Sequence, residues 1–168
     1  KGETCRRNYK GLIINRGYAF EDIAPDLVID RSYFIWKFMK ISFFQFLPKF
    51  NCLRDNIDSI KFLIKENKKA ISESDLLVLP EYSFTGPLNL KSFDYYKQQL
   101  KEIDVKKEFE IISKELNNIY IVFGSIILPT HNKFSNLSLV YCNGKEIGSY
   151  NKKALIYNEN YICESDNK

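Results

Sequence analysis

From residue 39 onward, apolar positions fall into short runs with either strand or helix spacing. Residues 39–46, MKISFFQF, form an apolar and aromatic run that predicts a strand. Residues 51–71 predict an amphipathic helix, with Asp55 early and lysines late. Its recurring apolar positions are Ile57, Ile60, Phe62, Leu63 and Ile64. Residues 76–80, LLVLP, are typical of a strand covered on both faces, so the order strand, helix, strand opens an α/β layer.

The second half adds strands faster than helices. After a polar stretch, residues 105–118 carry apolar side chains three or four positions apart and predict a second helix. Residues 120–128, YIVFGSIIL, and 134–142, FSNLSLVYC, predict two strands, and residues 143–145, NGK, predict a hairpin turn between the second of them and residues 146–156. The pattern therefore indicates an α/β fold, with a mixed sheet and helices outside it.

Residues 1–37 show no sustained period, because Gly11, Gly17 and Pro25 interrupt short apolar runs. We expect an unassigned N-terminal extension over residues 1–37 and a domain over residues 38–168.

Composition narrows the function classes. The net charge of +4 comes from lysines scattered among acidic residues, so we expect no nucleic-acid partner. Four distant cysteines and His131, the single histidine, give no metal-site spacing, and we expect no metal and no cofactor. No apolar run is long enough for a membrane span, which favours a cytoplasmic protein without a membrane partner. The triplet Asn136-Leu137-Ser138 is a formal glycosylation site, discounted because it lies in a predicted strand.

Glu81 is the first candidate for chemistry. It follows Pro80 at the end of a predicted buried strand, and the carboxyl ends of strands are where α/β sheets usually bind ligands. A carboxylate held partly out of water there has a raised proton affinity, which suits a general base. The alternative is a glutamate that caps a turn or pairs on the surface, which is more common for an isolated glutamate.

Two lysines, Lys152 and Lys153, interrupt the last strand-like stretch, SYNKKALI. An ammonium near a strand end could stabilise a developing oxyanion. The alternative is a solvated pair that protects an edge strand, and spacing alone does not decide between them.

Five pieces in order resemble the nitrilase superfamily over about residues 39 to 168. They are MKISFFQF with Gln45 near its end, Asn56-Ile57 with the helix that follows, LLVLPEYSFTG, IVFGSII, and FSNLSLVYCNGKEIGSYNKKAL. The resemblance implies an α-β-β-α sandwich, incomplete at the C-terminus, and a carbon–nitrogen hydrolase that uses a Glu-Lys-Cys triad. Its substrate would be a small amide, nitrile or carbamoyl compound, and we expect a homo-oligomer when the protein is complete.

On this resemblance, Glu81 takes the place of the general base and Lys152 that of the oxyanion-stabilising cation. Lys152 is preferred to Lys153 because it lies, with Tyr150 and Leu155, on the family's spacing. A further acid often assists in this family, and either Glu159 or Glu164 could match it.

The nucleophile departs from the family's pattern. Cys163 arrives too early after the lysine and lacks the preceding apolar strand, and Cys142 is expected to pack in the core. We therefore expect no turnover from this chain alone, and self-association through a sheet face left uncovered. The alternatives are a non-catalytic α/β interaction module, in which Glu81 and Lys152 form only an ion pair, and part of a related N-acyltransferase.

Overall fold

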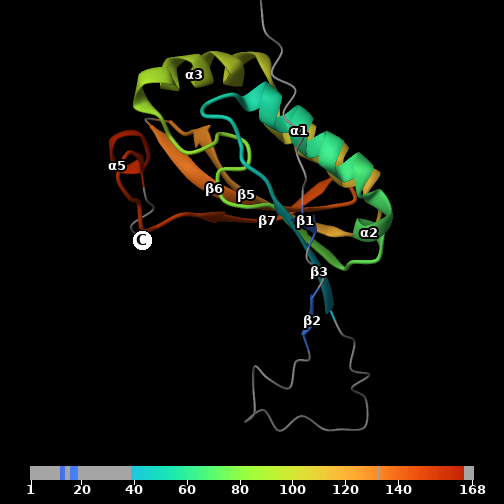
Figure 1. Ribbon diagram of the computed structural model, residues 1–168. Helices are drawn as coiled ribbons and strands as arrows, with labels where there is room; N and C mark the ends of the chain where they lie inside the picture. The colour runs from blue at the N-terminus through green and yellow to red at the C-terminus, as the bar shows by residue number, and fades with distance from the viewer. Residues whose placement is uncertain (1–11, 14–15, 19–38, 132, 165–168) are drawn as a thin grey trace, which may run out of the picture.

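The computed structural model in Figure 1 describes residues 12–13, 16–18, 39–131 and 133–164. The strands are β1 (Leu12–Ile13), β2 (Arg16–Tyr18), β3 (Met39–Gln45), β4 (Leu76–Val78), β5 (Tyr120–Pro129), β6 (Phe134–Cys142) and β7 (Lys145–Asn151). The helices are α1 (Leu53–Glu66), α2 (Lys68–Ser72), α3 (Phe93–Glu102), α4 (Val105–Glu115) and α5 (Glu159–Ile162), with a 3-10 turn, η2, at Leu90–Ser92.

The strands form one mixed sheet in the order β1-β3-β4-β5-β6-β7, and β2 also pairs with β3. β3, β4 and β5 run parallel, whereas β5, β6 and β7 are antiparallel neighbours. The predicted α/β class and the strands and helices proposed from residue 39 onward are confirmed. The predicted hairpin is confirmed as well, because Asn143 (φ 50°) and Gly144 (φ 78°) both adopt the left-handed backbone of a tight turn between β6 and β7.

One face of the sheet carries the core. Helices α1 and α3 lie on the same side of the sheet (Figure 1), and α4 contacts β5, β6 and β7. Alternate strand residues point toward this layer and are buried, namely Phe44, Leu77, Ile121, Phe123, Leu139 and Tyr141. The ring of Phe109 in α4 stacks on Phe123 with centroids 4.1 Å apart. The predicted apolar face of α1 is correct except at Phe62, which is 53% exposed.

The opposite face of the sheet has little cover from the described residues. Phe43, Val78, Val122 and Val140 lie side by side across β3 to β6, and Phe43 is 36% exposed while the three valines are only partly buried. Within the described residues, the predicted strand at residues 76–80 is fully buried on one face and only partly buried on the other. A short apolar run reveals that a strand is buried, but it does not reveal from which side.

Helix α3 was missed in the sequence, where it read as a polar stretch. Its buried side chains include two polar ones that bond to distant backbone groups. The Tyr96 hydroxyl donates to the carbonyl of Ile127 (2.7 Å), and the Gln99 amide donates to the carbonyl of Asn51 (2.8 Å). The buried face of α3 includes polar side chains whose main partners lie in distant segments, so the sequence read as polar.

Part of the unassigned region joins the sheet. β1 and β2 both pair antiparallel with β3, and sequence pattern gave no sign of either pairing. The remainder of residues 1–37, together with the expected domain boundary at 37/38, lies outside the described residues.

Candidate functional site

Glu81 stands where the parallel strands end. β4 stops at Val78, and the chain reaches Glu81 through Leu79 and Pro80, at the carboxyl-terminal edge that β3, β4 and β5 share. Gly124 of β5 makes this path possible. A Cβ atom there would lie 2.1 Å from the carbonyl oxygen of Pro80 and 2.6 Å from that of Leu79. The position of Glu81 therefore depends on a glycine in the neighbouring strand.

The turn after the candidate base is held by hydrogen bonds to several elements. Tyr82 adopts a left-handed backbone (φ 58°), and its N–H donates to the Ser125 hydroxyl (3.2 Å). The N–H of Gly86 donates to the carbonyl of Tyr82 (2.7 Å), and the Asn56 side chain of α1 donates to the carbonyl of Phe84 (2.8 Å). These contacts give the Pro-Glu segment a defined shape at the end of β4.

Lys152 reaches Glu81 from the end of β7. Its N–H donates to the carbonyl of Asn136 in β6 (2.8 Å), which fixes the backbone, and its Nζ donates to Oε1 of Glu81 (2.9 Å). The structure thus brings together the acid and the amine that the sequence analysis selected, although 71 residues separate them. Lys153, the competing lysine, is exposed.

Glu159 is the second acid beside Lys152. Its side chain is buried, and its Oε1 accepts from Lys152 Nζ (3.1 Å), from Asn136 Nδ2 (2.7 Å) and from the Tyr82 hydroxyl. Its Oε2 accepts from the N–H of Ile156 (2.8 Å). Glu164, the other candidate, accepts from the Thr130 hydroxyl on an exposed part of the surface instead. Of the two candidates, Glu159 and not Glu164 therefore lies beside Lys152.

The surroundings keep this network charged. Burial by itself raises the pKa of Glu159, but the hydrogen bonds from Tyr82, Ile156, Lys152 and Asn136 outweigh it and lower that pKa. Burial likewise lowers the pKa of Lys152, and the two carboxyl groups beside it more than compensate, so its pKa is raised. The pKa of Tyr82 is raised by burial and by its bond to Glu159, so the phenol remains a donor. The Lys152 ammonium therefore lies between the carboxyl groups of Glu81 and Glu159.

A cavity of about 290 Å³ opens at this network. It is lined by Leu79, Glu81, Val122, Gly124, Ser125, Asn136, Ser138, Tyr150 and Lys152. The side chain of Glu81 is 52% exposed, against 23% for Lys152. The described residues alone therefore leave the candidate base in contact with water.

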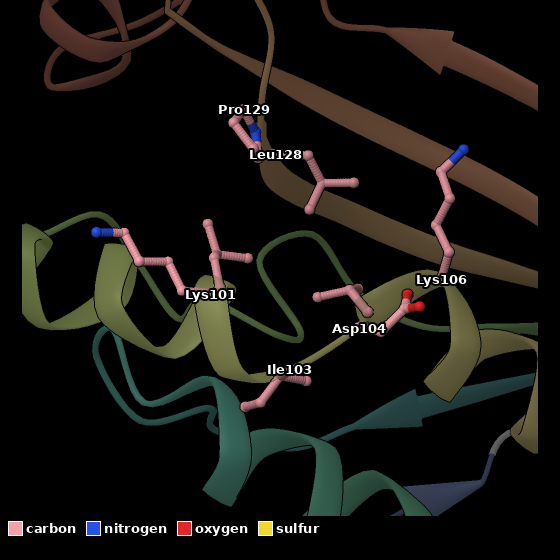
Figure 2. Close-up of a pocket in the computed structure, with 8 residues that line it drawn as sticks. Lys101, Ile103, Asp104, Lys106, Leu128 and Pro129 are labelled. Atoms are coloured by element: carbon pink, nitrogen blue, oxygen red, sulfur yellow. The ribbon is translucent and has the colours of Figure 1, made fainter.

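A larger cavity, about 430 Å³, lies between the α3–α4 junction and the end of β5 (Figure 2). Lys101 and Lys106 stand at opposite ends of it in Figure 2, and its walls are mainly apolar. Asp104 at its margin is engaged as the N-cap of α4, accepting from the N–H of Lys107 (3.0 Å). This cavity lacks the paired acid and amine of the smaller one, so we place the candidate chemistry in the smaller cavity.

No cysteine in the described ranges is set up as a nucleophile beside Lys152. Cys163 is buried, and burial together with Glu159 raises its pKa to about 12. Burial and Asp55 raise the pKa of Cys52. Cys142 is the last residue of β6, whereas Asn136 lies near the start of that strand. Cys142 is partly exposed, so the expectation that it packs in the core is wrong. A thiolate, the form that attacks carbon, is disfavoured at Cys163 and at Cys52.

The described residues hold no group of three or more His, Cys, Asp or Glu side chains arranged for a metal ion. Over the same ranges, the helices are all too short or too polar to cross a bilayer. His131 is exposed. Asn136 is fully buried, which argues against the formal glycosylation triplet as a modification site.

Two members of the network, Tyr82 and Asn136, escaped the sequence analysis. Tyr82 directly follows the candidate base, and Asn136 begins the discounted Asn-Leu-Ser triplet. Neither position carried a spacing signal, since both bond to Glu159, which lies 77 and 23 residues further along the chain.

Several solved structures share the architecture of this chain. No family model matches the chain, and neither does any curated protein. An amidase of the nitrilase superfamily from Nesterenkonia is 17% identical over 77% of this chain and 49% of its own, with a TM-score of 0.64. An N-terminal amidase is 22% identical over 76% and 31% (TM-score 0.59). A glutamine-dependent NAD(+) synthetase from Cytophaga hutchinsonii is 18% identical over 77% and 22% (TM-score 0.60).

The matched region thus spans at most about half of each of these structures. At such identities the likeness concerns architecture, and the chain has the carbon–nitrogen hydrolase fold of nitrilase-superfamily amidases, as the sequence resemblance implied.

Proposed function

We propose that this chain supplies the general base and the oxyanion-stabilising lysine of a hydrolase that acts on non-peptide carbon–nitrogen bonds. One observation carries the proposal. The Lys152 ammonium lies 2.9 Å from Glu81 and 3.1 Å from the buried Glu159, beside a cavity at the carboxyl-terminal edge of the parallel strands. A surface ion pair requires neither the second, buried carboxylate nor the cavity.

In the complete protein, Glu81 would take the proton from a cysteine thiol, and the thiolate would attack the carbon of an amide, nitrile or carbamoyl group. For an amide, Lys152 would stabilise the oxyanion of the tetrahedral intermediate. Protonated Glu81 would then return its proton to the departing nitrogen, which leaves as ammonia or an amine. Water, deprotonated by Glu81, would hydrolyse the remaining thioester and release the acid and the thiol.

We infer that none of the three described cysteines, Cys52, Cys142 and Cys163, is the nucleophile. Cys163 is buried and its pKa is raised to about 12, which makes it a poor source of thiolate. The side chain of Glu81 is 52% exposed, so further chain over this site would be needed to shield it from water during the reaction. We therefore propose that this chain by itself has no turnover.

Amides are the first substrates to test. The solved relatives include two kinds of amidase, and the N-terminal amidase has been solved with Gln-Val and Asn-Glu-Ala peptides. A panel of simple amides, nitriles, carbamoyl compounds and short peptides with N-terminal Asn or Gln covers the proposed class. Ammonia release by a longer protein that continues past residue 168 is the readout.

Substitutions in that longer protein test the roles. Glu81→Gln should lower kcat by about 10²- to 10⁴-fold, and Lys152→Ala by about 10²- to 10³-fold. Lys153→Ala is the matched control, because Lys153 is the exposed neighbour of Lys152 and should leave kcat unchanged. Full activity in the Glu81→Gln variant would exclude the proposed base.

The remaining parts of the proposal follow the sequence analysis: a small-molecule substrate, no nucleic-acid or membrane partner, a cytoplasmic location and a homo-oligomer when complete. A related N-acyltransferase would be recognised if an added amine captured the acyl group in competition with water. An interaction module would show no turnover with any substrate of the panel, and Glu81→Gln would change nothing but stability.

A further inference from the structure

Three donors from three separate segments converge on a single oxygen, Oε1 of Glu159. The Tyr82 hydroxyl comes from the turn after β4, Asn136 Nδ2 (2.7 Å) from β6, and Lys152 Nζ (3.1 Å) from the end of β7. Two of the donors are neutral. We propose that Tyr82 and Asn136 are positioning residues, which hold Glu159 as a carboxylate aimed at Lys152. The inference rests on the proposed function, since it concerns how that site keeps its lysine in place.

Tyr82 contacts both members of the Glu159–Lys152 pair. Its hydroxyl bonds to Glu159, and its ring faces the Lys152 ammonium, with Nζ 5.8 Å from the ring centroid. The direction of the side chain is set by the backbone, because Tyr82 adopts a left-handed conformation and its N–H is tied to Ser125 Oγ (3.2 Å). Tyr82 also follows Glu81 directly, so it links the candidate base to the buried acid.

Asn136 holds the same pair from the sheet. Its backbone carbonyl accepts from the N–H of Lys152 (2.8 Å), while its side chain donates to Glu159. Because the partner is a carboxylate, the amide must present its NH₂ group there. The other end of the amide, Oδ1, is buried without a protein partner in the described chain. Replacing Asn136 by Leu therefore removes a donor without breaking a second side-chain bond.

Neutral donors have a particular consequence for the site. They stabilise the Glu159 carboxylate without adding charge, so Glu159 does not depend on Lys152 alone to stay ionised. Lys152 then retains its charge for an oxyanion in the adjoining cavity. If Lys152 were the sole donor to Glu159, the two side chains could move together and Lys152 would lose its fixed position.

The pKa of Glu159 depends on the charged and titratable groups that face it. Lys152 faces it from the end of β7, Tyr82 from the turn that also carries Glu81, and Cys163 from the end of its own helix. Of these, only Lys152 is a cation. Removal of a neutral donor should therefore change the pKa of Glu159 without changing the charge around it.

The test is an NMR titration of the Glu159 side-chain carboxyl carbon in this chain. Tyr82→Phe retains the ring and removes the hydroxyl, and Asn136→Leu removes the amide donor. Each substitution should raise the pKa of Glu159 by about one unit, and the double variant by about two. Tyr150→Phe is the matched control, because Tyr150 lines the same cavity without a bond to Glu159, and it should leave that pKa unchanged.

The outcome is separable from that of the proposed hydrolysis, because the titration involves no turnover. A folded Tyr82→Phe variant whose Glu159 pKa equals that of the unmodified chain overturns the inference, even if the longer protein is an active hydrolase. Raised pKa values in this chain, together with a longer protein that hydrolyses none of the panel substrates, would support the positioning role and overturn the proposed function. Should Asn136→Leu fail to fold, Tyr82→Phe decides alone. In an active longer protein, Tyr82→Phe should also move the acidic limb of the kcat–pH profile upward.

Discussion

The two faces of the sheet differ sharply, although the same strands build both. Toward the helices, Phe123 is fully buried and its ring stacks on Phe109. On the other face, Phe43 is 36% exposed, and Val78, Val122 and Val140 are only partly buried. The candidate cavity takes Val122 from this second face. The hydrophobic core and the candidate cavity therefore lie on opposite faces of one sheet, and the face with the cavity is the less covered one.

The largest effect expected is at the covered face. Phe123→Ala should reduce the free energy of unfolding by about 3 to 5 kcal/mol, since it leaves a cavity in a stacked aromatic core. Val122→Ala, one residue away but on the other face, should cost only about 1 kcal/mol or less. Denaturant unfolding of both variants measures the contrast. Equal losses at the two positions would show that the second face is covered in solution.

Gly124→Ala tests how the sheet carries the site. A Cβ at this position would meet the Pro80 carbonyl oxygen at 2.1 Å, so β4 must move and Glu81 with it. We expect a loss of about 2 to 3 kcal/mol in unfolding free energy. Gly148→Ala is the matched control in β7, where the nearest side-chain atom, on Val140, is 4.0 Å away. If the two alanine variants are equally stable, Gly124 does not position the Pro-Glu segment.

Glu159→Gln probes the buried acid and predicts a change with pH. The pKa of Glu159 is lowered in the folded state from its ordinary value of 4.5, so its contribution is present above that value and is lost as the pH falls through the folded pKa. At pH 7 the free energy of unfolding of the variant should be about 1.5 kcal/mol lower than that of the unmodified chain. This difference should shrink below about pH 4. Thermal unfolding at a series of pH values measures this.

Glu164→Gln is the control for that series, because Glu164 bonds to the Thr130 hydroxyl at an exposed position. It should change stability little at any pH. A loss that is the same for Glu159→Gln at pH 7 and at pH 3 would mean that the carboxylate charge is not what stabilises the network.

The smallest effect on stability is expected on the less covered face. Val78→Thr and Val140→Thr should each change the unfolding free energy by less than about 1 kcal/mol, yet reduce self-association of the chain. Sedimentation velocity over a range of concentrations gives the association state. A monodisperse monomer before any substitution would show that this face does not drive association.

Sequence by itself determined most of the order of strands and helices after residue 39, since that order rests on local chemistry. The spacing of apolar residues marked β3, α1, α4, β5 and β6, and Asn143-Gly144 marked the hairpin through the backbone conformation that those residues tolerate. Ordered motifs also selected Glu81 and Lys152, which the fold brings to 2.9 Å. These features need no knowledge of what packs against them.

Tertiary structure alone decided the rest. Whether Glu159 or Glu164 joins Lys152 depends on where α5 packs, and the roles of Tyr82 and Asn136 depend on bonds to Glu159 across 77 and 23 residues of chain. The same holds for the choice of which sheet face is covered and for α3, whose buried polar groups bond to distant segments. Hydrophobic spacing records that a residue is buried, whereas the partner that satisfies a buried polar group is set by the packing of segments far apart in sequence.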